Sequence, residues 1–263
     1  RSLTLPGAME GIRFLFRPDF SKIDSSAILA ALGQVFFSMS IGMGTLITYA
    51  SYFPKKDNLL GTSFSVALTD TFVALLAGIA IFPAVFSFHI EPGFGPGLVF
   101  VTLPGIFQQM PGGSFFALLF FVLLALAALT STISVLEVIV AFFTEELKMS
   151  RKAATWTAAG TVSILGLMST LAWNPLMKDI TLFGKNVFEI LDFTSANILL
   201  PAGGFFIVLF VAWFFGREKA SAELSNDGAL KAGYTPFYMF LIRFIAPVAL
   251  AIIFLNGIGL LRL

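Results

Sequence analysis

Two carboxylates lie inside apolar stretches of this sequence, where a charged side chain is costly. Asp70 falls within 59–87 and Glu137 within 115–143. A carboxylate at mid-membrane costs about 2.5–3.5 kcal/mol on insertion scales, so it normally has a partner or a function. Among the lysines and arginines, only Arg243, near a helix end, is expected at comparable depth. Asp70 is therefore a candidate cation ligand, with a structural salt bridge as the alternative, and Glu137 is expected in a water-filled pathway.

A second candidate cation site is a stripe of polar and small residues within 115–143. Its members recur at i, i+3, i+4, i+7 and i+8 and so share one face of a helix. They are Ala127, Thr130, Ser131, Ser134 and Val135. Hard cations such as sodium take oxygen ligands, and a carbonyl beside two adjacent hydroxyls supplies three. The alternative is that these hydroxyls only bond back to carbonyls of their own helix.

A run of hydroxyls and glycines interrupts the first apolar stretch. Residues 25–54 are uncharged and carry Ser38, Ser40, Gly42 and Gly44 near their middle. Glycine weakens a helix by about 1 kcal/mol relative to alanine, and an unpaired backbone group in hydrocarbon costs several kcal/mol more. Such a break is tolerated only where it faces protein, water or a ligand. We expect a broken helix with a binding site at the break; a small-residue packing notch is the alternative.

The elements that must position these residues are membrane helices. Hydrophobic residues make up 57% of the 263 residues and charged residues only 12%, and the mean hydropathy is +0.93. This composition predicts an all-α polytopic membrane protein. The net charge of +1 gives no electrostatic basis for binding nucleic acid. The absence of cysteine excludes disulfides, thiolate metal sites and cysteine nucleophiles in this sequence.

Apolar stretches separated by charged and turn residues predict six membrane spans. They are 28–52, 59–87, 115–143, 154–173, 188–215 and 237–260. The stretch at about 88–113 is rich in glycine and proline, and we expect it to fold back onto the bundle. We expect no signal peptide here, because the leading residues lack a charged segment followed by a short apolar stretch and a small-residue cleavage site.

Basic residues predict the orientation of these spans. Eight of them come after the first, third and fifth spans, so those loops are expected in the cytoplasm. They are Lys55, Lys56, Lys148, Arg151, Lys152, Arg217, Lys219 and Lys231. The basic residues of the leading segment contradict this rule.

Three stretches of the sequence resemble the neurotransmitter:sodium symporter family. They are 34–52, 127–135 and 144–151. The likeness covers essentially the whole chain. It is greatest to the bacterial amino-acid branch, particularly the multi-hydrophobic amino acid transporter type, on the strength of Gly42-Met43-Gly44 and Asp70.

The resemblance implies the second inverted repeat (helices six to ten) of a LeuT-type fold, plus helix eleven. Residues 1–27 would form an extracellular loop, which explains the basic leading segment. Residues 28–215 would hold helices six to ten, with an extracellular loop at about 88–113, residues 216–236 would form a cytoplasmic loop, and residues 237–263 would form helix eleven. Helices one to five, the N-terminal half of the same transporter, would be the partner of this chain.

The resemblance also implies a function. A sodium-coupled symporter, not an enzyme, would import neutral hydrophobic or aromatic L-amino acids across the cell membrane, the inner membrane of a bacterium. Two alternatives stay open: a proton-coupled carrier of the same architecture, in which Asp70 or Glu137 carries the proton, and a non-transporting membrane subunit. An intramembrane hydrolase is disfavoured, because the sequence has no Gly-x-Gly-Asp-type motif and no His-Glu-x-x-His motif.

Roles carry over only to matching positions. The substrate-binding positions are Phe37, Ser40, Met43, Ser131 and Val135. The sodium-ligand positions are Ser38 and Asp70 in a first site, and Ala127, through its carbonyl, Thr130 and Ser131 in a second. The positions of the family's chloride site are Gln34, Ser38, Asp70 and Ala74. The gate positions are Asp192 on the outer side, whose arginine partner lies in the first helix, and Ser51, Tyr52 and Glu145 on the cytoplasmic side.

One departure from the family pattern concerns chloride. The family commonly has asparagine where this sequence has Asp70, and relatives that need chloride have serine where it has Ala74. A carboxylate about 4 Å from sodium gains about 4 kcal/mol at an effective dielectric constant of 20. We therefore expect Asp70 to replace the bound anion and transport to be independent of chloride.

Overall fold

The computed structural model describes residues 1–54, 57–90, 95, 97–172, 174, 181–182 and 184–261. The chain divides into two compact units. Unit 1 comprises Arg1–Ile23 and Phe64–Ser131, and unit 2 comprises Asp24–Ser63 and Thr132–Leu263. Two of the basic residues used to predict orientation, Lys55 and Lys56, lie outside the described residues.

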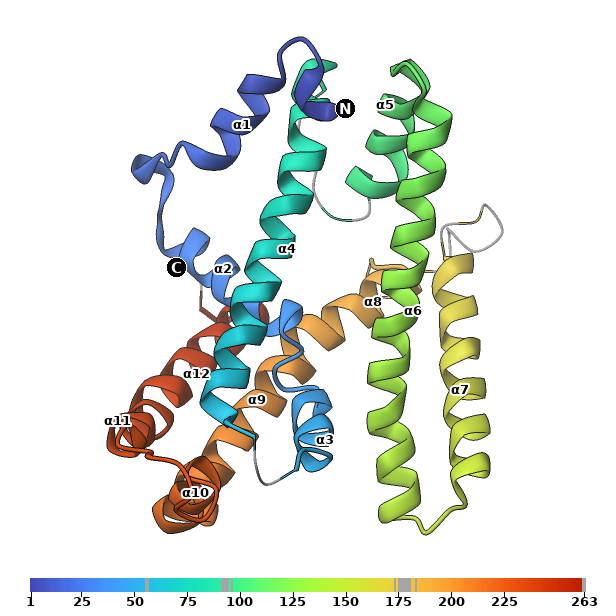
Figure 1. The fold of residues 1–263 in the computed structure, drawn as a ribbon. Helices are drawn as coiled ribbons and strands as arrows, with labels where there is room; N and C mark the ends of the chain where they lie inside the picture. The colour runs from blue at the N-terminus through green and yellow to red at the C-terminus, as the bar shows by residue number, and fades with distance from the viewer. Residues whose placement is uncertain are drawn as a thin grey trace. The chain divides into compact units, whose positions relative to one another are not determined.

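Helices account for nearly all the regular structure of the described residues (Figure 1). The α-helices are α1 Ala8–Phe16, α2 Ser25–Ser38, α3 Thr45–Ser51, α4 Leu59–Ser87, α5 Leu103–Gln109, α6 Gly113–Glu145, α7 Arg151–Leu171, α8 Val187–Phe193, α9 Leu200–Leu209, α10 Gly216–Leu224, α11 Thr235–Phe240 and α12 Ala246–Gly257. The π-helical segments are η3 Leu98–Thr102, η4 Thr194–Leu199, η5 Phe210–Phe215 and η6 Leu241–Ile245, and the short 3-10 segments are η1 Ser2–Thr4 and η2 Phe20–Lys22.

Four helical stretches of the described residues are long and apolar enough to cross a membrane. They are Leu59–Ser87, Gly113–Glu145, Val187–Leu224 and Thr235–Gly257. The π-helical turns η4, η5 and η6 join shorter α-helices into the last two of these stretches. The chain is therefore an all-α, multi-pass membrane protein.

Two of the six predicted spans, 28–52 and 154–173, are not among these four stretches. The helix ends lie within about three residues of the predicted span ends, except at one. The helix α4 begins and ends at the predicted residues. The fifth helical stretch continues beyond 215 as α10, over residues expected in the cytoplasmic loop. Hydropathy misses this extension because Gly216–Leu224 is polar, whereas its lysine, glutamate, alanine and leucine residues are strong helix formers.

The segment after α4 folds back in unit 1, as predicted. Leu103 and Ile106 of α5 pack against Ala84 and Val85 of α4 in a buried cluster. Within α4, Pro83 has no N–H to donate to the carbonyl of Ile79, one turn earlier. The hydroxyl of Ser2 donates to that carbonyl at 3.4 Å. The N-terminal segment thereby contacts the proline turn of α4.

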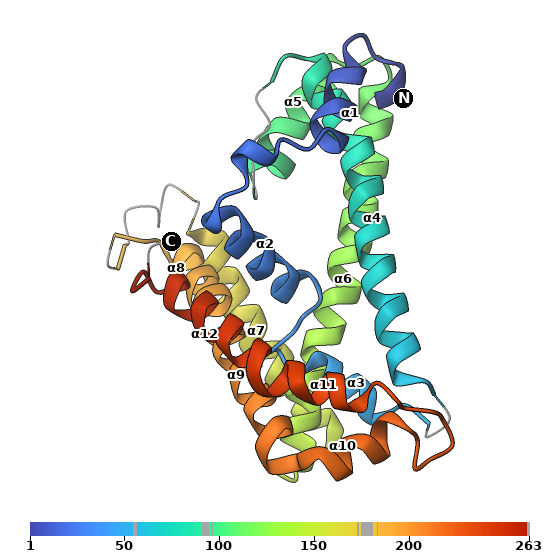
Figure 2. The ribbon, with the colours of Figure 1, turned by 90° about the vertical axis from the view of Figure 1, so that its left-hand side faces the viewer.

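Two pairs of neighbouring helices lie within unit 2. The start of α7 packs on the end of α6 through Ala154, Ala158 and Val140. The helices α9 and α12 lie side by side in both views (Figures 1 and 2). Beside these helices, the Nε of Arg243 in η6 donates to the carbonyl of Ala212 in η5 at 3.1 Å. This arginine, predicted near a helix end, thus bonds to a π-helical carbonyl.

Candidate functional site

The predicted break in the first apolar stretch is present and has a defined geometry. The helix α2 ends at Ser38, where the amide of Ile41 bonds to the carbonyl of Phe36 at 2.9 Å and the amide of Ser40 to the carbonyl of Phe37 at 3.1 Å. This pair of bonds is a Schellman motif, which normally places glycine in its left-handed position. Ser40 occupies that position here, with φ of 53°. A side chain is therefore held where glycine is easier to accommodate.

The chain re-enters a helix at α3 after two further left-handed residues. Gly42 has φ of 89° and Gly44 has φ of 82°, and Gly44 precedes the first residue of α3. The first amides of a helix have no acceptor within that helix. Residues 39–44, which we call the broken segment, therefore lie between the last carbonyls of one helix and the first amides of another, an arrangement suited to polar groups of a ligand.

The predicted substrate-binding positions divide between the two units. Phe37, Ser40 and Met43, on or beside the broken segment, belong to unit 2, as does Val135 of α6. Phe37 and Val135 are exposed, with relative accessibilities of 51% and 42%. Ser131 belongs to unit 1. The roles of all five remain predictions.

A hydrogen bond joins the second half of α3 to α6 within unit 2. The hydroxyl of Tyr49 donates to the hydroxyl oxygen of Ser134 at 2.6 Å. Ser134 belongs to the polar stripe of α6 and lies next to Val135. The sequence singled out Ser134 but offered no partner for it, because Tyr49 is 85 residues away along the chain.

The predicted ligands of the first sodium site come from two helices. Gln34 and Ser38 are four residues apart on α2, in unit 2, and Asp70 and Ala74 are four residues apart on α4, in unit 1. Each pair therefore shares one face of its own helix. Both the first sodium site and the chloride-site equivalent remain predictions.

The residues of the second sodium site lie together on α6 in unit 1. The hydroxyl of Thr130 donates to the carbonyl of Ala127 at 2.9 Å, so two of the three predicted ligand oxygens are neighbours. This is also the back-bonding alternative, realised at Thr130. Carbonyl and hydroxyl oxygens each have two lone pairs, and Ser131 comes directly after Thr130 with an exposed side chain. The donor set of carbonyl and hydroxyl oxygens fits a hard monovalent cation.

A cluster of three side chains lies at the other end of the stripe, within unit 2. Arg151 donates through Nη2 to both carboxylate oxygens of Glu137, at 2.9 and 2.8 Å. The hydroxyl of Tyr52 donates to the same carboxylate at 3.0 Å. The hydrogen bonds that Arg151 donates to Glu137, together with the negative charge of that carboxylate, raise the pKa of Arg151 above its ordinary value. Glu137 therefore has a charged partner on the next helix.

Sequence reasoning missed the pairing of Glu137 with Arg151, which it used only as an orientation marker. A short turn joins α6 and α7 and makes the two helices neighbours. Equal distance from the turn does not pair these two residues, because Glu137 lies eight residues before the end of α6 whereas Arg151 begins α7. Arg151 is the first residue of α7, and Ser150 caps that helix by accepting a hydrogen bond from the amide of Ala153.

The other cytoplasmic gate positions are exposed and lie near these elements. Glu145 is the last residue of α6. The hydroxyl of Ser51 donates back to the carbonyl of Thr48 at 2.7 Å. Among the three predicted gate positions, Tyr52 has a side-chain partner in a neighbouring helix, Glu137 of α6.

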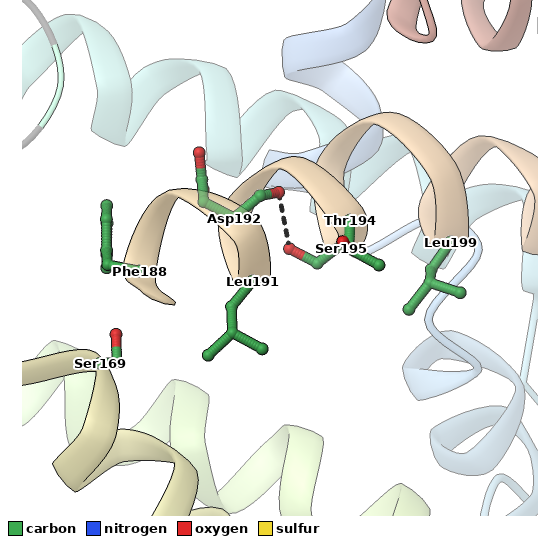
Figure 3. Close-up of a pocket in the computed structure, with 7 residues that line it drawn as sticks. All are labelled: Ser169, Phe188, Leu191, Asp192, Thr194, Ser195 and Leu199. Carbon is green, nitrogen blue, oxygen red and sulfur yellow. Dashed lines mark hydrogen bonds between the residues drawn. The ribbon is translucent and has the colours of Figure 1, made fainter. Parts of the chain in front are cut away.

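The predicted outer gate residue, Asp192, borders a pocket of about 350 Å³ (Figure 3). Residues of α7, α8 and η4 line this pocket, which lies within unit 2. They are Ser169, Phe188, Leu191, Asp192, Thr194, Ser195 and Leu199. The hydroxyl of Ser195 donates to the backbone carbonyl of Asp192 at 3.0 Å. The pocket is apolar apart from Asp192 and three hydroxyls.

Comparison with known proteins agrees with this architecture. Residues 1–262 match the model of the Sodium:neurotransmitter symporter family. The chain is 42% identical, over 99% of its length and 58% of the relative, to an uncharacterised sodium-dependent transporter of Bacillus subtilis (strain 168), YhdH. It is 41% identical, over 98% of its length and 56% of the relative, to an uncharacterised sodium-dependent transporter of Haemophilus influenzae.

A solved structure agrees as well. The crystal structure of MhsT in complex with L-phenylalanine is 44% identical to this chain and superposes with a TM-score of 0.85, covering 97% of this chain and 58% of MhsT. The chain belongs to the Sodium:neurotransmitter symporter family and has the LeuT-type fold of that family. It spans between half and two thirds of the length of these relatives.

Proposed function

We propose that the complete protein is a sodium-coupled symporter that imports neutral hydrophobic or aromatic L-amino acids by alternating access. The observation that carries this proposal is the broken segment, where Ser40 is held in a left-handed conformation next to Phe37 and Met43. The solved relative, which shares 44% identity, is described in complex with L-phenylalanine. Two apolar side chains, Phe37 and Met43, and one hydroxyl, Ser40, are suited to bind a hydrophobic or aromatic amino acid.

Sodium is the proposed coupling ion. The carbonyl of Ala127 and the hydroxyl of Thr130 lie 2.9 Å apart, and Ser131 would add a third oxygen to the second site. Ser38 and Asp70 would contribute to the first. Sodium drives transport only if it binds one of the two access states more tightly than the other. We assign this preference to the outward-facing state.

The proposed gates lie at opposite ends of the helices. Tyr52, Glu137 and Arg151 would close the cytoplasmic side together with Ser51 and Glu145. Asp192 would close the outer side with an arginine of the N-terminal half. We place the protein in the cell membrane, and the bacterial origin of two relatives supports the inner membrane of a bacterium.

Uptake of labelled tryptophan and leucine by the complete protein in proteoliposomes tests the proposal. An external sodium medium is compared with a potassium medium at the same ionic strength. We expect uptake only with sodium. Equal uptake in both media rejects sodium coupling, and a lack of uptake of every neutral apolar amino acid rejects the substrate class.

Replacing chloride by gluconate tests the proposed role of Asp70. Uptake should continue unchanged, because the carboxylate supplies the negative charge itself. The variant Asp70→Asn should lose sodium affinity at least tenfold, equivalent to about 1.4 kcal/mol. The double variant Asp70→Asn with Ala74→Ser, which matches chloride-dependent relatives, should regain uptake only in chloride. A collapse of wild-type uptake in gluconate overturns the role.

A proton-coupled carrier of the same architecture is the second candidate. In such a carrier Asp70 or Glu137 would carry the proton. Both oxygens of Glu137 already accept hydrogen bonds from Arg151, at 2.9 Å or less, so we assign Glu137 to the cytoplasmic gate. Uptake driven by a pH gradient in sodium-free medium distinguishes a proton-coupled carrier from a sodium-coupled one.

A further inference from the structure

The broken segment rests directly on the backbone of α9, with glycine on both sides of the contact. A Cβ atom built on Gly203 of α9 would lie 2.5 Å from the carbonyl oxygen of Gly42. A Cβ built on Gly42 would lie 2.9 Å from the amide nitrogen of Gly204 and would also overlap the carbonyl of Leu200. Non-bonded carbon atoms are normally about 3.5–4.0 Å apart. Neither position has room for a side chain.

The atoms that crowd Gly203 are backbone atoms, and these cannot swing aside. Gly204, the next residue, differs in this respect: a Cβ there would meet the Phe36 ring at 3.1 Å and a methyl of Leu250 at 3.4 Å. Side chains of this kind can adjust by changing rotamer. Gly203 and Gly204 can therefore be compared directly: an added methyl group would meet backbone atoms at Gly203 and side-chain atoms at Gly204.

The helix α9 is itself held in place by packing against its neighbours. Leu200 and Pro201 are buried, and α9 packs along α12, where Leu250 is 2% exposed. On another side, the broken segment contacts α6: a Cβ on Gly44 would lie 3.2 Å from Cγ1 of Val138. Val138 lies one helical turn after Val135, a proposed substrate contact. The segment thus touches α9 through Gly42 and α6 through Gly44.

We propose that Gly203 is a positioning residue that sets the size of the substrate side chain the transporter accepts. Its missing side chain lets the Gly42 carbonyl rest on α9, and this contact fixes where Ser40 and Met43 stand relative to Val135. This assignment of size selection rests on the proposed function; the positioning of the broken segment does not. A methyl group on Gly203 must displace Gly42 by about 1 Å to reach normal contact distance, which moves the segment away from α9 and reduces the space beside α6.

The test is Gly203→Ala in the complete protein, with kinetics measured for tryptophan and for alanine. We expect the KM for tryptophan to rise at least tenfold more than the KM for alanine, with turnover reduced less than KM. The control Gly160→Ala, on α7, has the same chemical change in a helix with nothing within 4 Å of the added carbon. It should behave as wild type. Gly204→Ala should give a smaller shift than Gly203→Ala.

A rescue variant separates positioning from general damage. Val138→Ala removes methyl groups on the α6 side, so alone it should favour tryptophan over alanine relative to wild type. Combined with Gly203→Ala, it should restore tryptophan uptake at least in part. If Gly203→Ala does not yield folded protein, the opposite shift in Val138→Ala still tests the proposal. Equal changes for both substrates, or no change in either variant, overturn it.

Hydrogen exchange of amides 39–44 provides a readout that needs no substrate. Exchange should be faster in Gly203→Ala than in wild type and in Gly160→Ala. If wild-type protein shows no sodium-dependent uptake but exchange rises, the proposed function fails and the positioning role of Gly203 stands without size selection. The other outcome is that the wild-type protein shows sodium-dependent uptake, while Gly203→Ala changes neither the exchange of amides 39–44 nor the ratio of the KM values for tryptophan and alanine. In that case the inference about Gly203 fails and the proposed function stands.

Discussion

Ser40 combines an unfavourable conformation with a side chain that the proposed site uses. Its φ of 53° falls in the left-handed region, which a non-glycine residue occupies at some cost in stability. Such strain persists where the surrounding structure holds it, and it is frequent at ligand sites. Here the Schellman bonds of Ser40 and Ile41 hold the conformation.

The variant Ser40→Gly separates the backbone conformation of the broken segment from the hydrogen bond that the Ser40 hydroxyl would make with the substrate. Glycine removes the left-handed strain, so the thermal midpoint of the complete protein should stay the same or rise. Loss of one hydrogen bond, about 1 kcal/mol, should raise the KM for the amino acid several-fold. Ser40→Ala loses the hydroxyl but keeps the strain, and serves as the comparison. An unchanged KM in both variants removes Ser40 from the site.

Glu137 and Arg151 form a pair whose contribution to stability is small. The arginine side chain is 65% exposed and the glutamate 20% exposed, and ion pairs of this kind contribute roughly 0–1 kcal/mol. Glu137 accepts hydrogen bonds from two other elements, through Tyr52 after α3 and Arg151 at the start of α7, and these bonds support the gating role proposed above.

A double-mutant cycle on Glu137→Gln and Arg151→Gln tests that function. Each single change should speed labelling of a cysteine placed at Ser51 from the cytoplasmic side, because the closed state loses a charged contact. The double variant should label no faster than the faster single variant, since the second change removes nothing further. The sequence contains no cysteine, so the introduced thiol is the only one in this segment. Additive effects contradict a direct pairing.

At the scale of elements, sequence reasoning succeeded for features that local physics determines. The apolar length of α4 and the position of the break between α2 and α3 were both predictable, because hydropathy and glycine act within one helix. The support of the broken segment by Gly203 was not. It depends on the approach of two backbones more than 150 residues apart in the chain, and a glycine within an apolar helix looks the same in the sequence whether or not it has such a neighbour.

In the candidate site, too, local features were predictable from the sequence and contacts between distant residues were not. The stripe on α6 was predictable from helical spacing, and its Thr130 to Ala127 bond is local. The partners of Ser134 and Glu137 come from other elements, so the sequence identified the residues without the contacts.

The start of α2 offers a prediction about pH. Asp24 caps this helix by accepting hydrogen bonds from the amide of Ala27 at 2.7 Å and the hydroxyl of Ser26 at 2.8 Å. The bond from the amide of Ala27, together with the weaker effect of Ser26, lowers the pKa of Asp24 below its ordinary value of 3.8. A lowered pKa means that the ionised cap stabilises the fold above pH 3.8, and that this contribution is lost as the pH falls through the lowered value.

Asp24→Ala should therefore lower the thermal midpoint at pH 7, and its difference from wild type should shrink as the pH falls below about 3.8. Asp24→Asn keeps a capping oxygen but has no group that titrates. The difference in thermal midpoint between Asp24→Asn and wild type should therefore also vary with pH in this range, although the variant keeps the cap. Differential scanning calorimetry in detergent across this range measures both. A difference between Asp24→Ala and wild type that is the same at pH 7 and at low pH contradicts the charged cap.

At the scale of the whole molecule, the chain holds ligand positions that require other parts of the transporter. The proposed sodium ligands Ser38, Asp70 and Thr130 lie on α2, α4 and α6, and the relatives continue well beyond the length of this chain. Oxygen ligands of a hard cation usually number six or more for calcium and magnesium. The few oxygens that we propose as ligands on these helices would hold sodium weakly unless other helices and the substrate complete the shell.

Sodium should therefore stabilise the complete protein and have little effect on residues 1–263 alone. A ligand at 100 times its Kd adds about 2.7 kcal/mol to the stability of the state that binds it, so the thermal midpoint of the complete protein should rise with sodium and not with potassium. Thr130→Ala with Ser131→Ala should reduce this rise, because it removes two proposed ligands of one site, whereas Gly160→Ala should preserve it. If residues 1–263 alone respond to sodium as strongly as the complete protein, then this half holds the ion by itself, and the N-terminal half that we propose for the complete protein serves the substrate and the gates instead.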